Sequence, residues 1–145
     1  MTSVDFYVLQ QNSIDDRKQF ACRLIDKVVR QGHKVILNEE QATDSADMDQ
    51  RLWAFKPESF IPHVVAGDAN TQNAAVVLVN TQNTGEDTEL HEDVLINLAM
   101  KPPSNFARFQ RLVEIVVQEP EILAATRKNY AIYKSQGYTI NMHKL

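Results

Sequence analysis

The chain has 145 residues, and its 43% hydrophobic and 23% charged residues are typical of one globular domain, residues 1–145. No apolar run approaches the ~18 residues that a membrane span requires. Residues 1–11 lack the basic start and the long apolar stretch of a signal peptide. The single Cys22 cannot form an internal disulfide. Together these features exclude a membrane or disulfide-rich class, and we expect a cytoplasmic protein.

The formal net charge is −4, but the two parts of the chain differ in sign. Residues 1–100 hold 8 Lys and Arg against 16 Asp and Glu, a net charge of −8, whereas residues 101–145 hold 7 against 3, a net charge of +4. An acidic body disfavours direct binding of nucleic acid, which needs a broad basic surface. The basic C-terminal third leaves room for a small site that binds an acidic peptide.

The N-terminal pattern predicts strand, helix and strand. Residues 4–9 are rich in β-formers and predict an interior strand. Ser13 with Asp16 predicts the capped start of a helix, which Gly32 ends, and residues 34–37 form the second strand. This order predicts a right-handed crossover and a parallel pair of strands. The predicted core face of the helix consists of Ile14, Phe20, Ala21, Leu24, Ile25 and Val28.

The rest of the chain continues the alternation of strands and helices. A second helix is predicted from Asp44 or Ser45 to about Phe55, and polar loops are predicted at 67–73 and 80–92. Further strands are expected at 63–65, 75–79, 93–98 and 112–117, a short helix around Phe106 and Phe109, a last helix at 119–136 and an edge strand at 138–142. The expected fold is a three-layer α/β domain with a mostly parallel open sheet, Rossmann-like but without a phosphate-binding loop.

Few residues suggest catalysis or cofactor binding. With only four glycines in the chain, neither GxGxxG nor GxxxxGK[ST] can be assembled, and no GxSxG is present. The four histidines are scattered, so we expect no metal and no cofactor. Cys22 is expected to be a buried, unreactive thiol. A small α/β enzyme acting on a nucleotide or similar metabolite stays an alternative, because an acid/base site needs only two well-placed residues.

The stretch RLWAFKPESFIPH, residues 51–63, holds the only Trp of the chain. Lys56 and Pro57 are predicted to end the second helix, because the residue before a proline disfavours helical angles. Trp53 and Phe60 are either core residues or the anchors of a partner-binding surface, since large aromatics are common in both settings. Composition alone leaves both interpretations open.

The last predicted helix carries a basic and aromatic face. Arg127, Tyr130, Ala131 and Lys134 share one side at spacings of three and four residues, and Lys128 lies at its edge. Arginine can form two hydrogen bonds with a carboxylate, while the ring and the aliphatic stems line a pocket. This face favours an acidic peptide with an apolar end, or it is simply a solvated helix surface.

Three motifs taken together resemble the chi subunit family of bacterial DNA polymerase III. They are FYVL at 6–9, LW-x(4)-ESFIPH at 52–63, and R-x-x-Y-x-x-Y-K-x-x-G-Y-x-I-N at 127–141. The resemblance covers nearly the whole chain, and its most specific part is the segment around Trp53. It implies a non-catalytic α/β accessory of the clamp loader in DNA replication, which connects that complex to single-stranded DNA-binding protein.

The resemblance also assigns two binding surfaces. Residues that dock the psi subunit, or a DNA repair helicase in its place, are Trp53, Pro57, Phe60 and Ile61. Residues that bind the acidic, Pro-Phe-ending tail of single-stranded DNA-binding protein are Arg127, Lys128, Tyr130, Lys134 and Val117. Relatives carry a further basic residue where this chain has Ala131, so tail affinity here is expected to be lower or to depend on Lys128.

Overall fold

The computed structural model describes residues 1–55, 61–66, 74–84 and 91–145. Within these ranges strands and helices alternate near both ends of the chain, and three strands follow one another in its middle, as the sequence predicts. The elements are β1 (Ser3–Val8), α1 (Ile14–Arg30), β2 (Val35–Glu39), α2 (Ala42–Ala54), β3 (His63–Val65), β4 (Val76–Asn80), β5 (Val94–Asn97), the 3₁₀ turn η2 (Phe106–Arg108), β6 (Arg111–Val116), α3 (Pro120–Ser135) and β7 (Ile140–Lys144).

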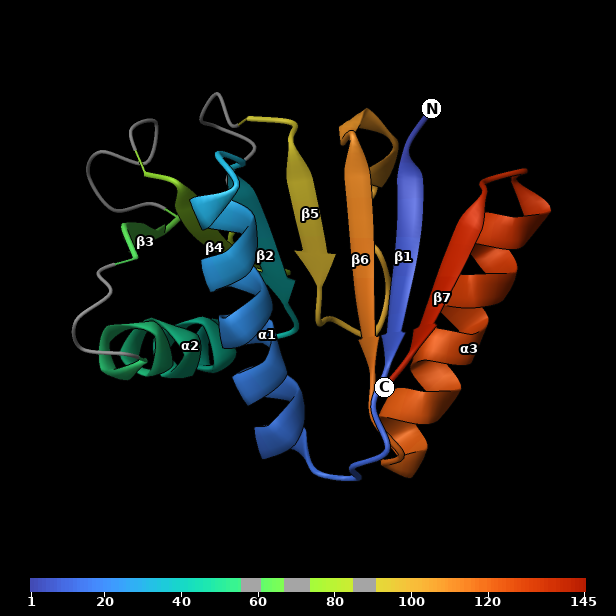
Figure 1. Cartoon of the computed structure of the whole chain (residues 1–145), viewed down its shortest axis with the longest axis horizontal. Coiled ribbons are helices and arrows are strands. Elements are labelled where there is room, and N and C mark those ends of the chain that lie inside the picture. Colours follow the sequence, from blue (N-terminus) through green and yellow to red (C-terminus); the bar gives the residue numbers. More distant parts are fainter. Residues whose placement is uncertain (56–60, 67–73, 85–90) are drawn as a thin grey trace.

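The strands form one parallel sheet in the order β3-β4-β2-β5-β6-β1-β7. Helices α1 and α2 lie on one side of the β2 half of the sheet, and α3 lies beside β7 at the other end (Figure 1). The α/β class and the open parallel sheet are therefore confirmed. A sheet with helices on both faces must bury both sides of its strands, and β2 and β4 are buried along their whole length.

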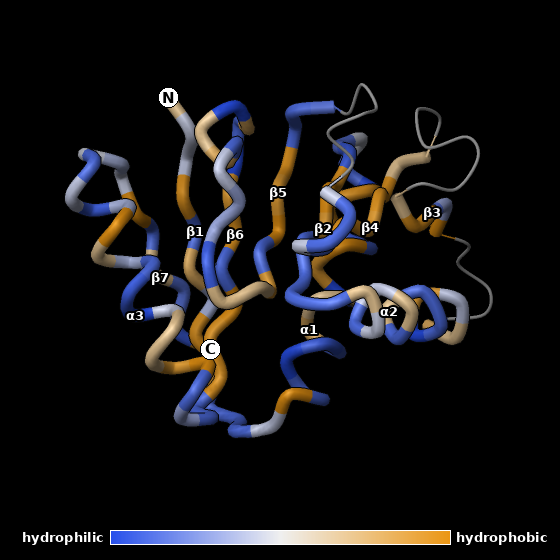
Figure 2. The backbone as a smooth tube through the Cα atoms, turned by 180° about the vertical axis from the view of Figure 1, so that it is seen from behind, coloured by the Kyte–Doolittle hydropathy of each residue, from blue (hydrophilic) through white to orange (hydrophobic). Residues whose placement is uncertain are grey.

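Two hydrophobic clusters fill the two sides of the sheet. The first joins α1 and α2 to alternate strand positions such as Leu37 and Ile115. The second joins α3 and η2 to the other set, including Phe6 and Leu112. Because successive side chains of a strand point to opposite faces, a shift of one residue moves a side chain from one cluster to the other. Figure 2 shows the hydrophobic strands beside the more hydrophilic tube of α2.

The expected direct pairing of β1 with β2 is wrong. β1 pairs with β6 and β7, whereas β2 pairs with β4 and β5. The crossover through α1 therefore spans two strands, β5 and β6, which the chain supplies later. Interior strands without polar alternation carry no signal that selects their neighbours, so the sequence predicted parallel strands but not their order.

The boundaries and core positions of the first two helices differ in detail from the prediction. Ser13 caps α1 as expected, accepting from the Asp16 N–H at 3.0 Å. Ile14 is 53% exposed rather than part of the core, because it is the first residue of α1, one turn before Arg17, where burial begins. Helix α2 begins at Ala42, earlier than predicted, because Gln41 and Asp44 form a reciprocal capping box.

The later elements agree closely with the prediction. Phe106 and Phe109 are buried at the single turn η2, and α3 and the edge strand β7 occupy the predicted part of the chain. Strand β7 begins at Ile140, two residues after the predicted start at Tyr138. The predicted loop at 67–73 and part of the loop at 80–92 lie outside the described residues.

Candidate functional site

Helix α3 forms because its first turn is capped and its sheet-facing positions are spaced for burial. The Glu119 side chain accepts a hydrogen bond from the Ile122 N–H at 2.9 Å, and Pro120 occupies the first turn, where its missing N–H costs no helical hydrogen bond. The buried positions of α3 are Ile122, Thr126, Asn129 and Tyr133. Their spacing of three and four residues leaves Arg127 and Tyr130 on a neighbouring flank of the helix.

A groove of about 160 Å³ lies between α3 and the strands at that end of the sheet. Its volume is comparable to a cavity that holds one benzene-sized ring. The Tyr130 ring meets the Phe6 ring edge-on at a centroid distance of 5.6 Å, and Lys134 Nζ lies 5.7 Å from the Tyr130 centroid. The strand side of the groove consists of Phe6, Val8, Val116 and Met142, and the helix side of Leu123, Thr126, Arg127 and Tyr130.

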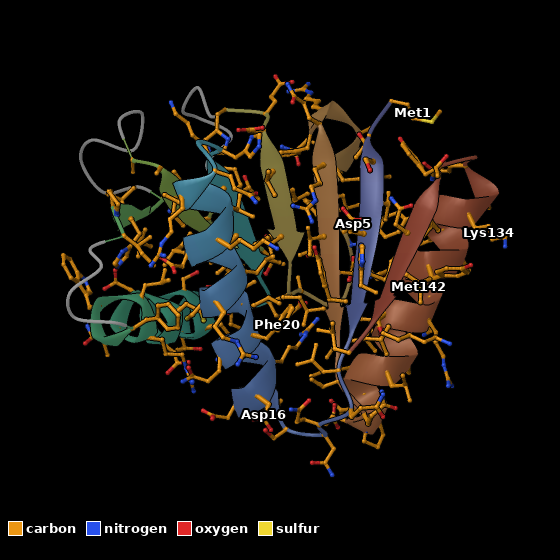
Figure 3. The ribbon with its side chains drawn as sticks, in the orientation of Figure 1. Met1, Asp5, Asp16, Phe20, Lys134 and Met142 are labelled. Carbon is orange, nitrogen blue, oxygen red and sulfur yellow. The ribbon has the colours of Figure 1, made fainter. Side chains whose placement is uncertain are left out.

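The groove has an apolar floor and a basic rim. Arg127, Lys128 and Lys134 are exposed, and the side chain of Lys134 extends outward from α3 in Figure 3. Ala131, on the same flank, is also exposed and adds no charge. An apolar side chain can fill such a floor while a nearby carboxylate pairs with the guanidinium of Arg127.

A hydrogen-bonded glutamate under α3 holds the helix in place. Glu114 is fully buried on β6, and its Oε2 accepts from the Tyr133 hydroxyl at 2.5 Å and from Asn97 Nδ2 at 3.0 Å. Asn129 Nδ2 lies 3.4 Å from Glu114 Oε1. Two residues of the buried face of α3 are thus tied to one strand, which fixes the flank that carries Tyr130.

The structure corrects the assignment of Val117 to this groove. Val117 is fully buried in the cluster under α1, whereas Val116 lies in the α3 cluster and lines the groove. Neighbouring positions of an extended chain point to opposite faces of a sheet, so the sequence placed the residue one position too late. Arg127 and Tyr130 do line the groove, and Lys134 Nζ lies near the Tyr130 ring. Lys128 is exposed on α3 and is not among the residues that line the groove.

The Trp53 surface lies at the opposite end of the molecule. Trp53 is 54% exposed at the end of α2, and its ring meets the His63 ring edge-on at 4.9 Å. His63 is itself fixed: its Nε2 lies 3.1 Å from Asp49 Oδ1, and its Nδ1 lies 2.7 Å from the Ile61 carbonyl oxygen. The tryptophan ring therefore packs on an ordered support, and about half of its surface is exposed.

The other residues assigned to that surface have different places. Ile61 is only 3% exposed and belongs to the core cluster under α1 and α2, so it is a packing residue rather than a contact residue in this structure. Pro57 and Phe60 lie outside the described residues. Of the four residues assigned there, Trp53 is the one that the described ranges place on the surface.

The two sites lie towards opposite ends of the sheet, which are six strand spacings apart, and the groove also extends over β1 and β6. The Trp53 surface adjoins β3 and the groove adjoins β7, which are the two ends of the sheet (Figure 1). At about 4.8 Å per strand this separation is roughly 29 Å.

A larger cavity, which the sequence did not indicate, lies over β2, β4 and β5 on the α3 side of the sheet. Its volume is about 960 Å³, and its walls include Asn38, His91 and Arg108. Burial lowers the pKa of His91 below its usual range. None of the residues assigned to either binding surface contributes to it. Its walls come from β2, β4 and β5 and from the three connections that follow these strands, which are far apart in the chain, so no local motif marks it.

The groove residues missed from the sequence are, besides Val116, Phe6, Val8, Leu123, Thr126 and Met142. A helical signal existed for Leu123, because Leu123, Arg127 and Tyr130 follow the same three- and four-residue spacing. No local signal placed β1 and β7 beside α3, since that contact follows from the strand order.

The described ranges offer no metal site and one buried thiol. Within them, no three His, Cys, Asp or Glu side chains are placed to hold a metal ion. Cys22 is buried as predicted, and burial raises the pKa of its thiol to about 11. None of the helices in these ranges combines the length and the hydropathy that crossing a bilayer requires.

Comparison with known proteins gives a consistent result along the chain. Residues 1–141 match the family model described as "DNA polymerase III chi subunit, HolC". The chain is 39% identical to the DNA polymerase III subunit chi of Pseudomonas aeruginosa over 145 residues, which is all of this chain and 98% of that protein. It is 27% identical to the subunit chi of Haemophilus influenzae, over 96% of this chain and 94% of that protein.

The subunit chi of Escherichia coli is 26% identical over 97% of both chains. The matches span the N-terminal strand, the Trp53 segment and α3 together, so they concern the whole fold and not one motif. The chain therefore belongs to the chi subunit family of DNA polymerase III, a family of replication accessory subunits.

Proposed function

We propose that this protein is a non-catalytic subunit that connects the clamp loader of DNA polymerase III to single-stranded DNA-binding protein. The observation that carries the proposal is the groove under Arg127 and Tyr130, with its apolar floor and basic rim. A Pro-Phe end fits this arrangement: the phenyl ring fills the floor and the terminal carboxylate pairs with the guanidinium. Acidic residues before the end face Lys128 and Lys134.

The Trp53 surface is the proposed docking site for the psi subunit, or for a DNA repair helicase that takes its place. An exposed tryptophan on an ordered support has the properties of an interface anchor, because little side-chain freedom is lost on binding. The Asp49–His63 contact beneath it provides that support.

The separation of the two sites supports the bridging role. One partner at each end of the sheet leaves both accessible, and several tails on one oligomer of single-stranded DNA-binding protein increase the effective affinity of a modest groove. The acidic body, with a net charge of −8 over residues 1–100, disfavours direct DNA binding. The protein is thus proposed to reach DNA through its partner and to act in the cytoplasm.

A titration with a labelled acidic peptide ending in Pro-Phe tests the groove. Arg127→Ala is expected to weaken binding by at least about tenfold, because the peptide carboxylate loses a charged hydrogen-bonding partner. Lys101→Ala is the matched control: it removes the same charge from an exposed residue of the same basic C-terminal third, outside the groove. The affinity should also fall as salt is raised.

Equal losses in Arg127→Ala and Lys101→Ala would show a general charge effect in place of a groove. No binding of the peptide at tens of micromolar would overturn the tail-binding proposal. Turnover of a nucleotide in the larger cavity would support the alternative of a small α/β enzyme instead.

Trp53→Ala tests the second surface. We expect it to weaken docking of the psi subunit by about 30-fold or more, as for a central aromatic anchor, and to leave tail binding unchanged. Gln50→Ala, an exposed neutral residue of the same helix, is the matched control. Loss of both activities in a folded Trp53→Ala protein would show that the two surfaces are not separate.

A further inference from the structure

Strand β7 ends the sheet, and among the described residues no strand pairs with its outer edge. It pairs with β1 alone, in parallel register from Val4 opposite Ile140 to Val8 opposite Lys144. Figure 1 shows it at the outer end of the sheet, beside α3. The open edge of a strand presents backbone N–H and C=O groups that can pair with an additional strand.

The ladder between β1 and β7 decides which backbone groups are open. The Thr139 C=O accepts a hydrogen bond from β1 at 3.3 Å, and the Leu145 N–H donates one to β1 at 3.0 Å. Because bonding to one neighbour alternates along a strand, the odd-numbered residues of this segment face β1. The N–H and C=O groups of Ile140, Met142 and Lys144 therefore face the open edge.

This open edge adjoins the groove. The Met142 side chain, labelled in Figure 3, is 47% exposed and lines the groove, while its backbone groups face the open edge in the register of the ladder. A peptide whose end occupies the groove must leave past α3 or past β7, and the second exit passes these free groups. The charges also suit an acidic segment, since exposed Lys144 lies on β7 and exposed Arg127 and Lys134 lie on α3.

We propose that an acidic peptide bound by its apolar end in the groove continues as an added strand along the open edge of β7. The inference rests on the proposed function of the groove and specifies how the residues before the peptide's end are held. Backbone pairing supplies affinity that does not depend on side-chain identity, and alternate acidic side chains lie on the same face as Lys144. The groove then selects the end, and the edge holds an extended, acidic segment of varied sequence.

Amide hydrogen exchange measured by NMR tests this pairing residue by residue. The full chain is saturated with either a ten-residue acidic peptide ending in Pro-Phe or the last four residues of the same peptide. With the longer peptide, the exchange rates of the Met142 and Lys144 amides should fall by at least about tenfold, as expected for newly paired strand amides. The amides of Asn141 and His143, which already face β1, are the internal controls and should change little.

A pair of variants separates the backbone from the side chain. Lys144→Pro removes an N–H that faces the open edge, where proline is tolerated, and Lys144→Ala removes the same charge but keeps the N–H. The proline variant should bind the longer peptide about fivefold more weakly than the alanine variant, which is the effect of one hydrogen bond. Both variants should bind the four-residue peptide equally.

The outcomes distinguish the inference from the function on which it rests. If the longer peptide binds while the Met142 and Lys144 amides exchange as in the free protein, the added strand is refuted and the groove stands. If neither peptide binds, the groove proposal fails, and the added strand fails with it.

Discussion

The two faces of the sheet each bury a glutamate, and the two side chains have different surroundings. Glu114 on β6 faces α3 and accepts hydrogen bonds from Tyr133 and Asn97. Glu39 on β2 points to the α1 and α2 face, is 2% exposed, and its Oε1 has no hydrogen-bond partner within the described part of the chain. A buried carboxylate without partners costs free energy that a paired one recovers in part.

The titration of the two groups follows from this difference. Burial raises the pKa of Glu39 to about 8; the charge of Lys18 opposes the shift, and the nearby Asp44 adds to it. Burial also raises the pKa of Glu114, but three side chains donate hydrogen bonds to it and the charge of Arg17 opposes the shift. The face that carries the groove thus has a satisfied polar centre, whereas the other face has a group that titrates near neutral pH.

Glu114→Ala should remove the acceptor of the hydrogen bonds under α3 and have the largest effect on stability. It leaves the donors of Tyr133, Asn97 and Asn129 buried without their acceptor, and we expect a loss of roughly 3–5 kcal/mol in the free energy of unfolding. Chemical denaturation measures this loss. Tail binding should weaken as α3 loses its attachment, while docking at Trp53 is expected to persist in the protein that stays folded.

Glu114→Gln is the control for volume. Glutamine keeps the shape and one acceptor oxygen, but its amide NH₂ faces side chains that are themselves donors. The loss in free energy of unfolding should therefore be smaller than for the alanine variant and larger than for a surface change. Equal stabilities of the wild type and the alanine variant would show that the hydrogen bonds around Glu114 do not hold α3.

Glu39→Gln should act in the opposite direction. The folded state holds the Glu39 proton more tightly than the unfolded state, so the contribution of Glu39 to stability is fully present below about pH 4.5 and is lost as pH rises to about 8. Glutamine removes this penalty, and we expect a gain on the order of 2 kcal/mol at pH 8.5 that is much smaller at pH 5. Denaturation at several pH values measures it; a gain that is independent of pH would contradict the assignment.

The sequence predicted the class of the fold better than the order of the strands in the sheet. The helix caps and the spacing of apolar residues are local signals, which is why α1 and α3 were found with their flanking strands. The separation of β1 from β2 has no local signal, because both strands are buried on both faces and would be compatible with several neighbours. The larger cavity was missed for the same reason, since its walls come from distant segments.

The candidate sites show the same limit at the level of single residues. Helical spacing was enough to bring Arg127, Tyr130 and Lys134 to one flank of α3. Motif resemblance was not enough to choose between Val116 and Val117, because one residue in a strand exchanges the two faces of the sheet. The segment around Trp53 likewise mixed an exposed ring with the buried Ile61, since a proline-containing stretch has no regular period from which exposure can be predicted.

Asp5→Asn tests whether the face of the sheet or the set of partners decides the cost of a buried carboxylate. Asp5 on β1 points to the same side as Glu39, yet it accepts from Arg111 Nε at 2.7 Å and lies 2.9 Å from His143 Nε2. Burial raises the pKa of Asp5, but these two hydrogen bonds outweigh that effect and hold it below its usual range.

Asp5 therefore stabilises the fold above about pH 4, and the contribution is lost as pH falls through its lowered folded-state pKa. Asp5→Asn should cost about 1–2 kcal/mol at pH 7, with little difference from wild type in acid, because the asparagine keeps the size but not the charge that joins β6, β1 and β7. Thermal or chemical denaturation at pH 7 and in acid measures the difference. If Asp5→Asn stabilises the protein, as Glu39→Gln is expected to, the cost of a buried carboxylate comes from its position on this face of the sheet. If Asp5→Asn destabilises the protein, the cost depends on whether the carboxylate has hydrogen-bond partners.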